Sequence, residues 1–140
     1  MDLTSIYQRI ILQKAQECPN SHEVTGGVHL TNPTCGDDIK ITADISRNQL
    51  TNLRVACDGC IICKGATAMM LEAIENLSTD EINQLVLNMS KMMTHEDFDD
   101  QLLGDLVAFQ AVVKLPIRIK CAMLPFKAIY QLINGDDTHR

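Results

Sequence analysis

The feature that most constrains the fold is a change of hydrophobic period after Gly59. Before it, residues 38–45 (DIKITADI) and 52–57 (NLRVAC) alternate apolar and polar side chains, as half-buried β-strands do. After it, apolar side chains recur at helical spacing, at Ala66, Met69, Met70, Ala73, Ile74 and Leu77. Strands followed by helices predict an α+β fold, with a three-stranded antiparallel sheet and helices packed on one face of it.

The first helix and the sheet follow from local signals. Apolar residues at helical spacing over residues 3–16 predict a helix that ends at Cys18-Pro19-Asn20. Residues 23–32 (EVTGGVHLTN) predict a short strand. The two alternating segments are expected to form a hairpin, joined by four or five turn residues around 46–49 (SRNQ). In the first of them, one strand face is expected to carry Ile39, Ile41, Ala43 and Ile45.

Three more helices are expected after residue 78. Ser78 and Glu81 have the spacing of a capping box, and the helix that they begin should bury Ile82, Leu85, Val86, Met89 and Met93. The next helix should stop before Pro116 and use Leu102, Leu106, Phe109 and Val113. Pro125 is expected in the first turn of a last helix that ends at Gly135. We assign the methionines at helical spacing to the core and not to a copper site.

Length and charge limit the class of protein. The chain has 140 residues, which predicts a single domain over residues 1–140. Its net charge is −6 and no Lys/Arg cluster offsets it, so we expect no nucleic-acid partner. The longest apolar stretch is too short to cross a bilayer and contains Lys114, and no signal peptide is evident. We therefore expect a cytoplasmic protein with no membrane contact and with reduced cysteines.

Three of the six cysteines have the spacing Cys57-x-x-Cys60-x-x-Cys63. The pattern is half of a ferredoxin cluster motif, but the fourth cysteine and its proline are missing. A zinc ribbon would need a second CxxC pair, which is also absent. Cys57 shares a strand face with Val55 and is expected to be a buried apolar thiol. Cys63 is either a packed side chain, which we favour, or a spare ligand or resolving thiol. Cys18 is remote and is given no role.

Four side chains remain as candidate metal ligands: Cys35, Asp37, Cys60 and Cys121. Cys35 and Asp37 flank a glycine that we expect to remove steric crowding. Cys60 falls where strand gives way to helix, so the positive end of the helix dipole should lower the pKa of its thiol. Cys121 is expected on a turn between two helical segments. Three thiolates and one carboxylate suit a tetrahedral ion such as Zn²⁺, in either an exchangeable site or a purely architectural one.

Other polar residues near these positions are less informative. The four histidines fit no ligand spacing, and His29 is expected to be a packed or half-exposed strand residue. Arg118 and Lys120 either offset the negative charge of the metal site or are solvated surface cations. The acidic residues 95–100 (HEDFDD) are read as a solvated approach to a helix.

Three motifs resemble those of the U-type iron–sulfur cluster assembly proteins, the IscU- and NifU-like family with a SufE/NifU-like fold. They are NPTCGD (residues 32–37), Gly59-Cys60 followed by GATAMM (residues 65–70), and LGDLVAFQAVVKLPIRIKCA (residues 103–122). The resemblance covers nearly the whole chain, in the order of the family. Sixty residues separate Cys60 from Cys121, and Lys120 precedes Cys121 where scaffolds of the family have histidine. Both details resemble the SufU branch.

The resemblance to the SufU branch implies a zinc-dependent sulfurtransferase. It implies that Cys35, Asp37, Cys60 and Cys121 bind Zn²⁺ and that Cys35 accepts persulfide sulfur from a SufS-like cysteine desulfurase. Downstream iron–sulfur assembly proteins would be further partners. The alternative within the family is a scaffold on which a [2Fe–2S] cluster is assembled and passed on. The N-terminal helix departs from the family pattern, as do Cys57 and Cys63, so the role of Cys63 in sulfur handling stays open.

Overall fold

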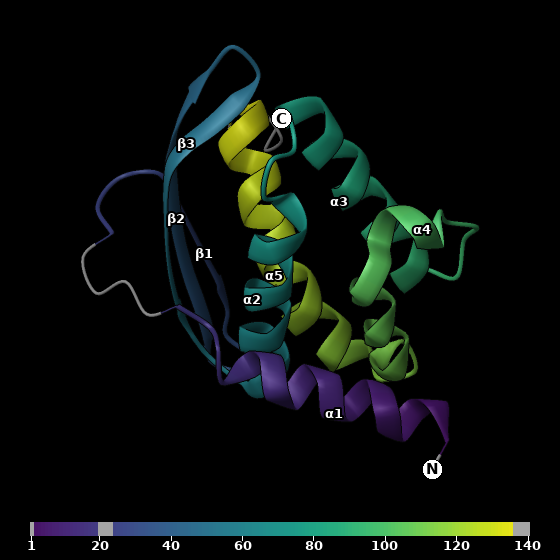
Figure 1. The fold of residues 1–140 in the computed structure, drawn as a ribbon. Helices are drawn as coiled ribbons and strands as arrows, with labels where there is room; N and C mark the ends of the chain where they lie inside the picture. The colour runs from purple at the N-terminus through teal and green to yellow at the C-terminus, as the bar shows by residue number, and fades with distance from the viewer. Residues whose placement is uncertain (1, 20–23, 136–140) are drawn as a thin grey trace.

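The structure, a computed structural model, describes residues 2–19 and 24–135 (Figure 1). Its elements in chain order are α1 (Leu3–Ala15), β1 (Val28–Asn32), β2 (Asp37–Ser46), β3 (Gln49–Asp58), α2 (Ile61–Ile74), α3 (Thr79–Met93), α4 (Asp100–Leu103), the 3₁₀ helix η1 (Gly104–Val112) and α5 (Pro116–Asn134). Asn20, His22, His139 and the residues after Gly135 lie outside the described residues.

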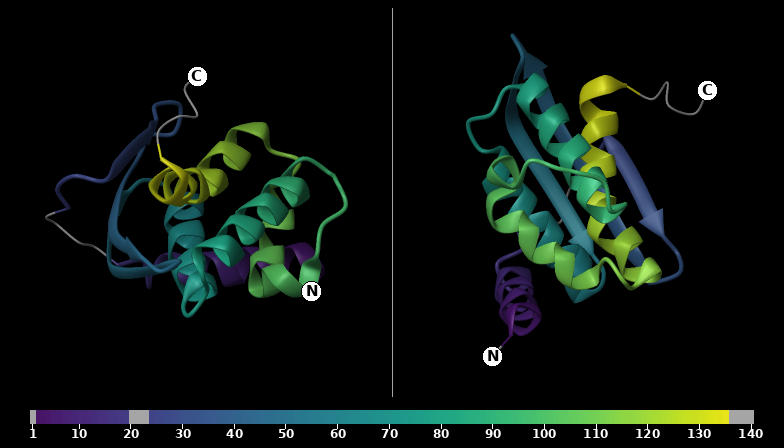
Figure 2. Two further views of the ribbon diagram at one scale, coloured as in Figure 1. Left: turned by 90° about the horizontal axis from the view of Figure 1, so that it is seen from above. Right: turned by 90° about the vertical axis from the view of Figure 1, so that its right-hand side faces the viewer.

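The predicted α+β fold is confirmed. The sheet has the order β1-β2-β3 with both pairs antiparallel, and Ile39 pairs with Leu30 on one side and with Cys57 on the other. All helices lie on one side of this sheet (Figures 1 and 2). Helix α5 contacts β1 and β2, whereas α2 contacts β3. Among the described residues, no helix is long and apolar enough to cross a membrane.

The hairpin turn is shorter than predicted. Arg47 and Asn48 alone connect β2 to β3, and their φ angles of 52° and 62° are those of a two-residue type I′ turn. The end of the hairpin reaches past the helices (Figure 1), which leaves Ile45 45% exposed although Ile39 and Ile41 on the same face are fully buried. The turn also contacts the start of helix α3, because Thr79 N donates a hydrogen bond to Asn48 O at 2.8 Å.

Helix α3 agrees with the sequence prediction, whereas α2 ends at Ile74 and does not include Leu77, which we expected on the same helix face. The Ser78 capping box is present, with Glu81 N to Ser78 Oγ at 3.1 Å and Ser78 N to Glu81 Oε1 at 2.9 Å. The predicted apolar positions of α3 are all buried. The buried methionines belong to one hydrophobic core, as expected: Met69, Met70, Met89, Met92, Met93 and Met123.

The segment before Pro116 is not the α-helix that we expected. A single turn of α4 ends at Gly104, whose φ is +55°, and η1 continues as a 3₁₀ helix. The buried residues follow a spacing of three, at Leu103, Leu106, Phe109 and Val112. That spacing matches the three residues per turn of a 3₁₀ helix, so Leu102 and Val113 do not join the buried row.

The start of the last helix was also predicted wrongly. Pro116 occupies the first position of α5, and Pro125 lies inside the helix. Both prolines satisfy the sequence rule for a helix start, but the earlier one begins the helix. Cys121 therefore lies within α5 and not on a turn. A proline at 125 has no N–H to donate to the Cys121 carbonyl four residues earlier.

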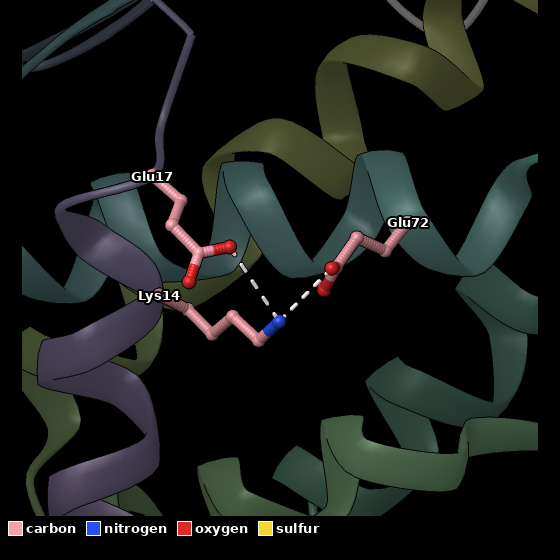
Figure 3. Close-up of polar contacts among 3 residues, drawn as sticks. All are labelled: Lys14, Glu17 and Glu72. Atoms are coloured by element: carbon pink, nitrogen blue, oxygen red, sulfur yellow. Dashed lines mark hydrogen bonds and ion pairs between the residues drawn. The ribbon is translucent and has the colours of Figure 1, made fainter.

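Helix α1 crosses the end of α2 and closes the core there. Gly65 allows the close approach, because a Cβ at this position would lie 2.9 Å from Ile11 O. Lys14 Nζ lies 2.9 Å from Glu72 Oε2 on α2 and 3.6 Å from Glu17 Oε1 (Figure 3). The hydrogen bond with Glu72 raises the pKa of Lys14. Ile11 and Ala15 of α1 are buried, while Ile6 is exposed.

Candidate metal centre

The turn between β1 and β2 carries the first candidate ligand, Cys35. Cys35 N donates to Asn32 O at 3.2 Å, and the thiol is partly exposed. Gly36 follows with a φ of +73°, a conformation that L side chains rarely adopt. A Cβ at Gly36 would meet nothing within 4 Å, so the glycine is required for its backbone conformation and not, as we expected, to remove crowding.

Asp37 begins β2 and is only 2% exposed. Its two carboxylate oxygens accept from different elements. Cys60 N donates to Oδ1 at 2.9 Å, and Asn32 Nδ2 donates to Oδ2 at 3.3 Å. These two hydrogen bonds hold the buried carboxylate in place.

Gly59 makes room for that carboxylate. A Cβ at residue 59 would overlap Oδ1 of Asp37 and lie 3.0 Å from Asp37 Cα. The absent side chain therefore lets the end of β3 pass directly beside Asp37, which brings Cys60 N into hydrogen-bonding range. Gly59 and Asn32 are contributors to the site to which our sequence reasoning gave no role, although both stand in the quoted motifs.

Cys60 and Cys121 approach the same region from two helices. Cys60 is the N-cap of α2, as predicted, and its side chain makes no capping hydrogen bond. Cys121 is fully buried on α5, with its Sγ 3.6 Å from Ile117 O and 3.6 Å from Asn32 Nδ2. Asn32 thus links Cys121 to Asp37 through one side-chain amide. Burial, followed by contact with Cys35, Asp37 and Cys60, raises the pKa of Cys121.

Three of the four predicted ligands form a compact group. One ligand atom each from Cys35, Asp37 and Cys121 lie within 4.8 Å of one another, the one such group of three or more in the described parts of the chain. The Cys60 thiol is outside this group, although its backbone N–H contacts Asp37 and the thiol also acts on the pKa of Cys121. Cys60 therefore borders the group without completing it.

A cation and an apolar rim surround the group. Electrostatic interaction with Cys60, followed by a hydrogen bond with Cys121, raises the pKa of Arg118. A cavity of about 540 Å³ next to Cys35 is lined by Thr34, Cys35, Leu115, Pro116, Ile117 and Arg118. Leu115 is 51% exposed and Ile117 is 54% exposed. Cys35 thus opens onto a surface that combines one arginine with bare aliphatic side chains.

The other three cysteines lie apart from this group. Cys57 is buried as predicted, but it is not an isolated thiol, since its Sγ lies 3.5 Å from Cys63 Sγ. Cys18 lies close enough to Cys57 for each thiol to shift the pKa of the other, so Cys18 is not remote from the other cysteines as we expected. Cys63 is fully buried, which agrees with the packed position that we favoured. On β1, His29 is half exposed, as expected, and contacts Asp38.

Comparison with known protein families gives separate evidence on which family this chain belongs to. The family pattern of the NifU-like N terminal domain matches residues 11–122, which include all four candidate ligands. The chain is 31% identical over 131 residues to a protein of Bacillus subtilis (strain 168) named zinc-dependent sulfurtransferase SufU, covering 91% of this chain and 89% of that protein. The chain is also 30% identical over 135 residues to a protein of Streptococcus pyogenes serotype M1 named iron–sulfur cluster assembly scaffold protein IscU. The match covers 94% of this chain and 84% of that protein.

A solved structure has the same fold. The crystal structure of FiSufU from Fervidobacterium islandicum AW-1, described as an iron–sulfur cluster assembly scaffold protein for the SUF system, superposes with a TM-score of 0.81. The match covers 92% of this chain and 97% of that one at 23% identity, so it establishes the fold alone.

Proposed function

The chain belongs to the family of the NifU-like N-terminal domain, and on that premise we propose a zinc-bound sulfurtransferase of iron–sulfur cluster assembly. In this proposal Cys35 accepts persulfide sulfur from a SufS-like cysteine desulfurase. The observation that carries it is the grouping of a partly exposed Cys35 with a buried Asp37 and a buried Cys121. The relative named a zinc-dependent sulfurtransferase supports the choice of reaction.

The donor set fits zinc. Cysteine thiolates and one carboxylate are usual ligands of this ion, and at Zn–S distances of about 2.3 Å two ligand atoms lie about 3.8 Å apart. The three grouped ligand atoms are already within 4.8 Å of one another, so side-chain rotations suffice to bring them to that spacing. Cys60 is the proposed fourth ligand, because its own backbone N–H is already hydrogen bonded to Asp37. When bound, zinc would keep sulfur in the thiolate form without taking part in redox chemistry.

The chain's own residues would perform the sulfur transfer. The Cys35 thiolate attacks the terminal sulfur of the desulfurase Cys–S–SH group. A new S–S bond forms on Cys35, the S–S bond of the donor breaks, and the donor cysteine leaves as a thiolate. The proton stays on the transferred sulfur. Arg118 lies where its guanidinium can offset the negative charge of the attacking and neighbouring thiolates.

Exposure and position together select the thiol that reacts. Cys121 is fully buried, whereas Cys35 and Cys60 are partly exposed. Of these two, Cys35 lines the cavity beside Arg118 and Cys60 does not. The exposed aliphatic side chains at this end of the molecule, Ile61, Leu115 and Ile117, would be covered by the desulfurase when its persulfide reaches Cys35. Downstream assembly proteins would then receive the sulfur from the same face.

The experiment that tests this proposal measures the sulfur on Cys35. The zinc-loaded protein is mixed with a SufS-like desulfurase and cysteine, and persulfides are trapped by alkylation and located by mass spectrometry. We expect a persulfide on Cys35 and a faster desulfurase, and neither for Cys35→Ser. Cys18→Ser is the matched control, because Cys18 lies outside the grouped residues, and it should behave as wild type. Full stimulation by Cys35→Ser would contradict the proposal.

The second candidate function is the [2Fe–2S] scaffold, which the IscU relative at 30% identity favours. Both functions use the same candidate ligands, so the ligands do not distinguish between the two functions. Anaerobic reconstitution of the protein with iron and sulfide distinguishes them. A stable visible [2Fe–2S] spectrum, together with no persulfide on Cys35, would favour the scaffold over the sulfurtransferase.

A further inference from the structure

A second cluster of thiols lies outside the candidate metal centre. Cys57, near the end of β3, is 7% exposed, and Cys63, in the first turn of α2, is fully buried. Their Sγ atoms are 3.5 Å apart. Cys18, just beyond the end of α1, is partly exposed and interacts with Cys57 but not with Cys63. Cys57 is thus the central thiol of the three, and none of them belongs to the group formed by Cys35, Asp37 and Cys121.

From this arrangement we propose that Cys57 and Cys63 form a peroxide-oxidised dithiol site, in which a hydroperoxide converts the pair to an intramolecular disulfide. A disulfide has an S–S distance of about 2.05 Å, so the two sulfurs must approach by about 1.5 Å. The two Sγ atoms are already in contact, so the bridge requires only this short approach. The site does not depend on the proposed sulfur-transfer function.

The neighbours of Cys57 make it the attacking sulfur. Hydrogen bonds from Cys18 and then from Cys63 lower the pKa of Cys57. The same contacts raise the pKa of Cys18 and of Cys63, so Cys57 is the thiol of the three whose ionisation these contacts favour. The thiolate is the form that reacts with peroxide.

The reaction balances with one hydroperoxide. Cys57 sulfur attacks one peroxide oxygen, an S–O bond forms, the O–O bond breaks, and the leaving oxygen departs as water. Cys57 is then a sulfenic acid, oxidised by two electrons. Cys63 sulfur attacks that sulfur, the S–S bond forms, the S–O bond breaks, and a second water leaves. The two thiol protons end in the two waters.

Burial selects both the oxidant and the resolving thiol. At 7% and 0% exposure, Cys57 and Cys63 are out of reach of a bulky disulfide such as oxidised glutathione, so the proposal requires an oxidant as small as hydrogen peroxide. Cys63 is held in the packed first turns of α2 at 3.5 Å, whereas Cys18 lies beyond the end of α1. We therefore assign the bridge to Cys63 and not to Cys18.

The test oxidises the full-length, zinc-treated protein with stoichiometric hydrogen peroxide and then blocks free thiols with N-ethylmaleimide. Cleavage after Arg54 and Lys64 and before Asp58 separates Cys57 from Cys60 and Cys63. We expect residues 55–57 to be joined to residues 58–64, with Cys60 unbridged, and the mass to fall by two hydrogens. Oxidised glutathione should give no such bridge. The assignment of the bridge holds whether or not the metal centre binds zinc.

Variants separate the two possible partners of Cys57. Cys18→Ser should keep the Cys57–Cys63 bridge, whereas Cys63→Ala should lose it and leave a sulfenic acid on Cys57 that dimedone traps. If the wild-type protein bridges Cys18 to Cys57 instead, or if Cys57 and Cys63 stay alkylatable after peroxide treatment, the proposal is wrong. The wild-type measurement decides the matter even if Cys63→Ala fails to fold.

Discussion

At the scale of single residues, Asn32 is the side chain whose effect on the metal centre can be measured best. Its amide donates to Asp37 at 3.3 Å and to Cys121 at 3.6 Å. Asn32→Ala removes both donors and leaves Asp37 with only the Cys60 N–H. Loss of such a supporting hydrogen bond lowers metal affinity about 10–100-fold, and we expect this loss in zinc competition with a chromophoric chelator.

Asn83→Ala is the matched control for that experiment. Asn83 exchanges side-chain hydrogen bonds of 3.2 and 2.9 Å with Asn134 on the exposed surface, away from the candidate ligands. Its replacement removes the same amide and should leave zinc affinity unchanged. Equal affinities for Asn32→Ala and wild type would show that Asn32 does not support the metal ligands.

Cys121 gives a prediction on pH for the metal-free protein. Burial raises the pKa of its thiol above the ordinary value of 9.0, so the folded state holds this proton more tightly than the unfolded state does. The resulting stabilisation is complete below the unfolded pKa and is lost as the pH rises above it. We expect the unfolding free energy of wild type to fall relative to Cys121→Ala between about pH 8 and about pH 10.5. Denaturant titrations of the two proteins that stay parallel across this range would refute the assignment.

The role of a residue was hardest to predict where it depends on tertiary packing. The acid, the thiols and the glycine of NPTCGD were recognised, but Gly36 serves its positive φ and not steric relief. Cys18 lies 39 residues before Cys57, and nothing local indicates that the end of α1 would bring the two thiols together. Asn32 acts through two partners, one of them 89 residues away.

At the scale of elements, the capping box of α3 should contribute measurably to stability. Ser78→Ala removes the acceptor for Glu81 N and should cost about 1 kcal/mol of unfolding free energy. Urea denaturation of metal-free protein measures this cost. Ser90→Ala in the same helix is the control, because the Ser90 side chain makes no hydrogen bond to the residues that the structure describes and Ala favours helix. If Ser78→Ala loses no more stability than Ser90→Ala, the capping box does not stabilise the protein.

Elements with a clear period were predictable, and those that depend on choices between similar signals were not. The alternation of apolar and polar residues before Gly59 predicts only strands, and the capping box at Ser78 predicts only the start of a helix. Pro116 and Pro125 offer the same signal for a helix start, and only packing of α5 against the sheet decides between them. The 3₁₀ segment was missed because its buried spacing of three, from Leu103 to Val112, differs little from helical spacing over nine residues.

At the scale of the whole molecule, the metal centre joins parts of the chain that are far apart in sequence. Its candidate ligands come from the β1–β2 turn, β2, α2 and α5. Zinc that binds only the folded state at about 1,000 times its Kd adds about 4 kcal/mol of stability. For a domain of this size that should raise Tm by roughly 10 °C. Thermal unfolding with and without a chelator measures the shift, and identical Tm values would mean that zinc does not bind across these elements.

Fold class and the hairpin of the sheet were therefore predictable from the hydrophobic pattern, and the candidate ligands were proposed from residue chemistry and family resemblance. Which ligands meet was not, because it depends on how α5 is placed against the β1–β2 turn. Cys60 shows the remaining gap, since its backbone N–H reaches Asp37 while its thiol stays outside the group formed by Cys35, Asp37 and Cys121.

The central claim is that one zinc ion is held by three cysteine sulfurs and one aspartate oxygen. X-ray absorption at the zinc edge of the loaded protein tests it most directly, with Cys60→Ser measured beside it. We predict three sulfurs at about 2.3 Å and one oxygen at about 2.0–2.2 Å in wild type, and two sulfurs in the variant. Only two sulfurs in wild type, unchanged by Cys60→Ser, would contradict the proposed centre.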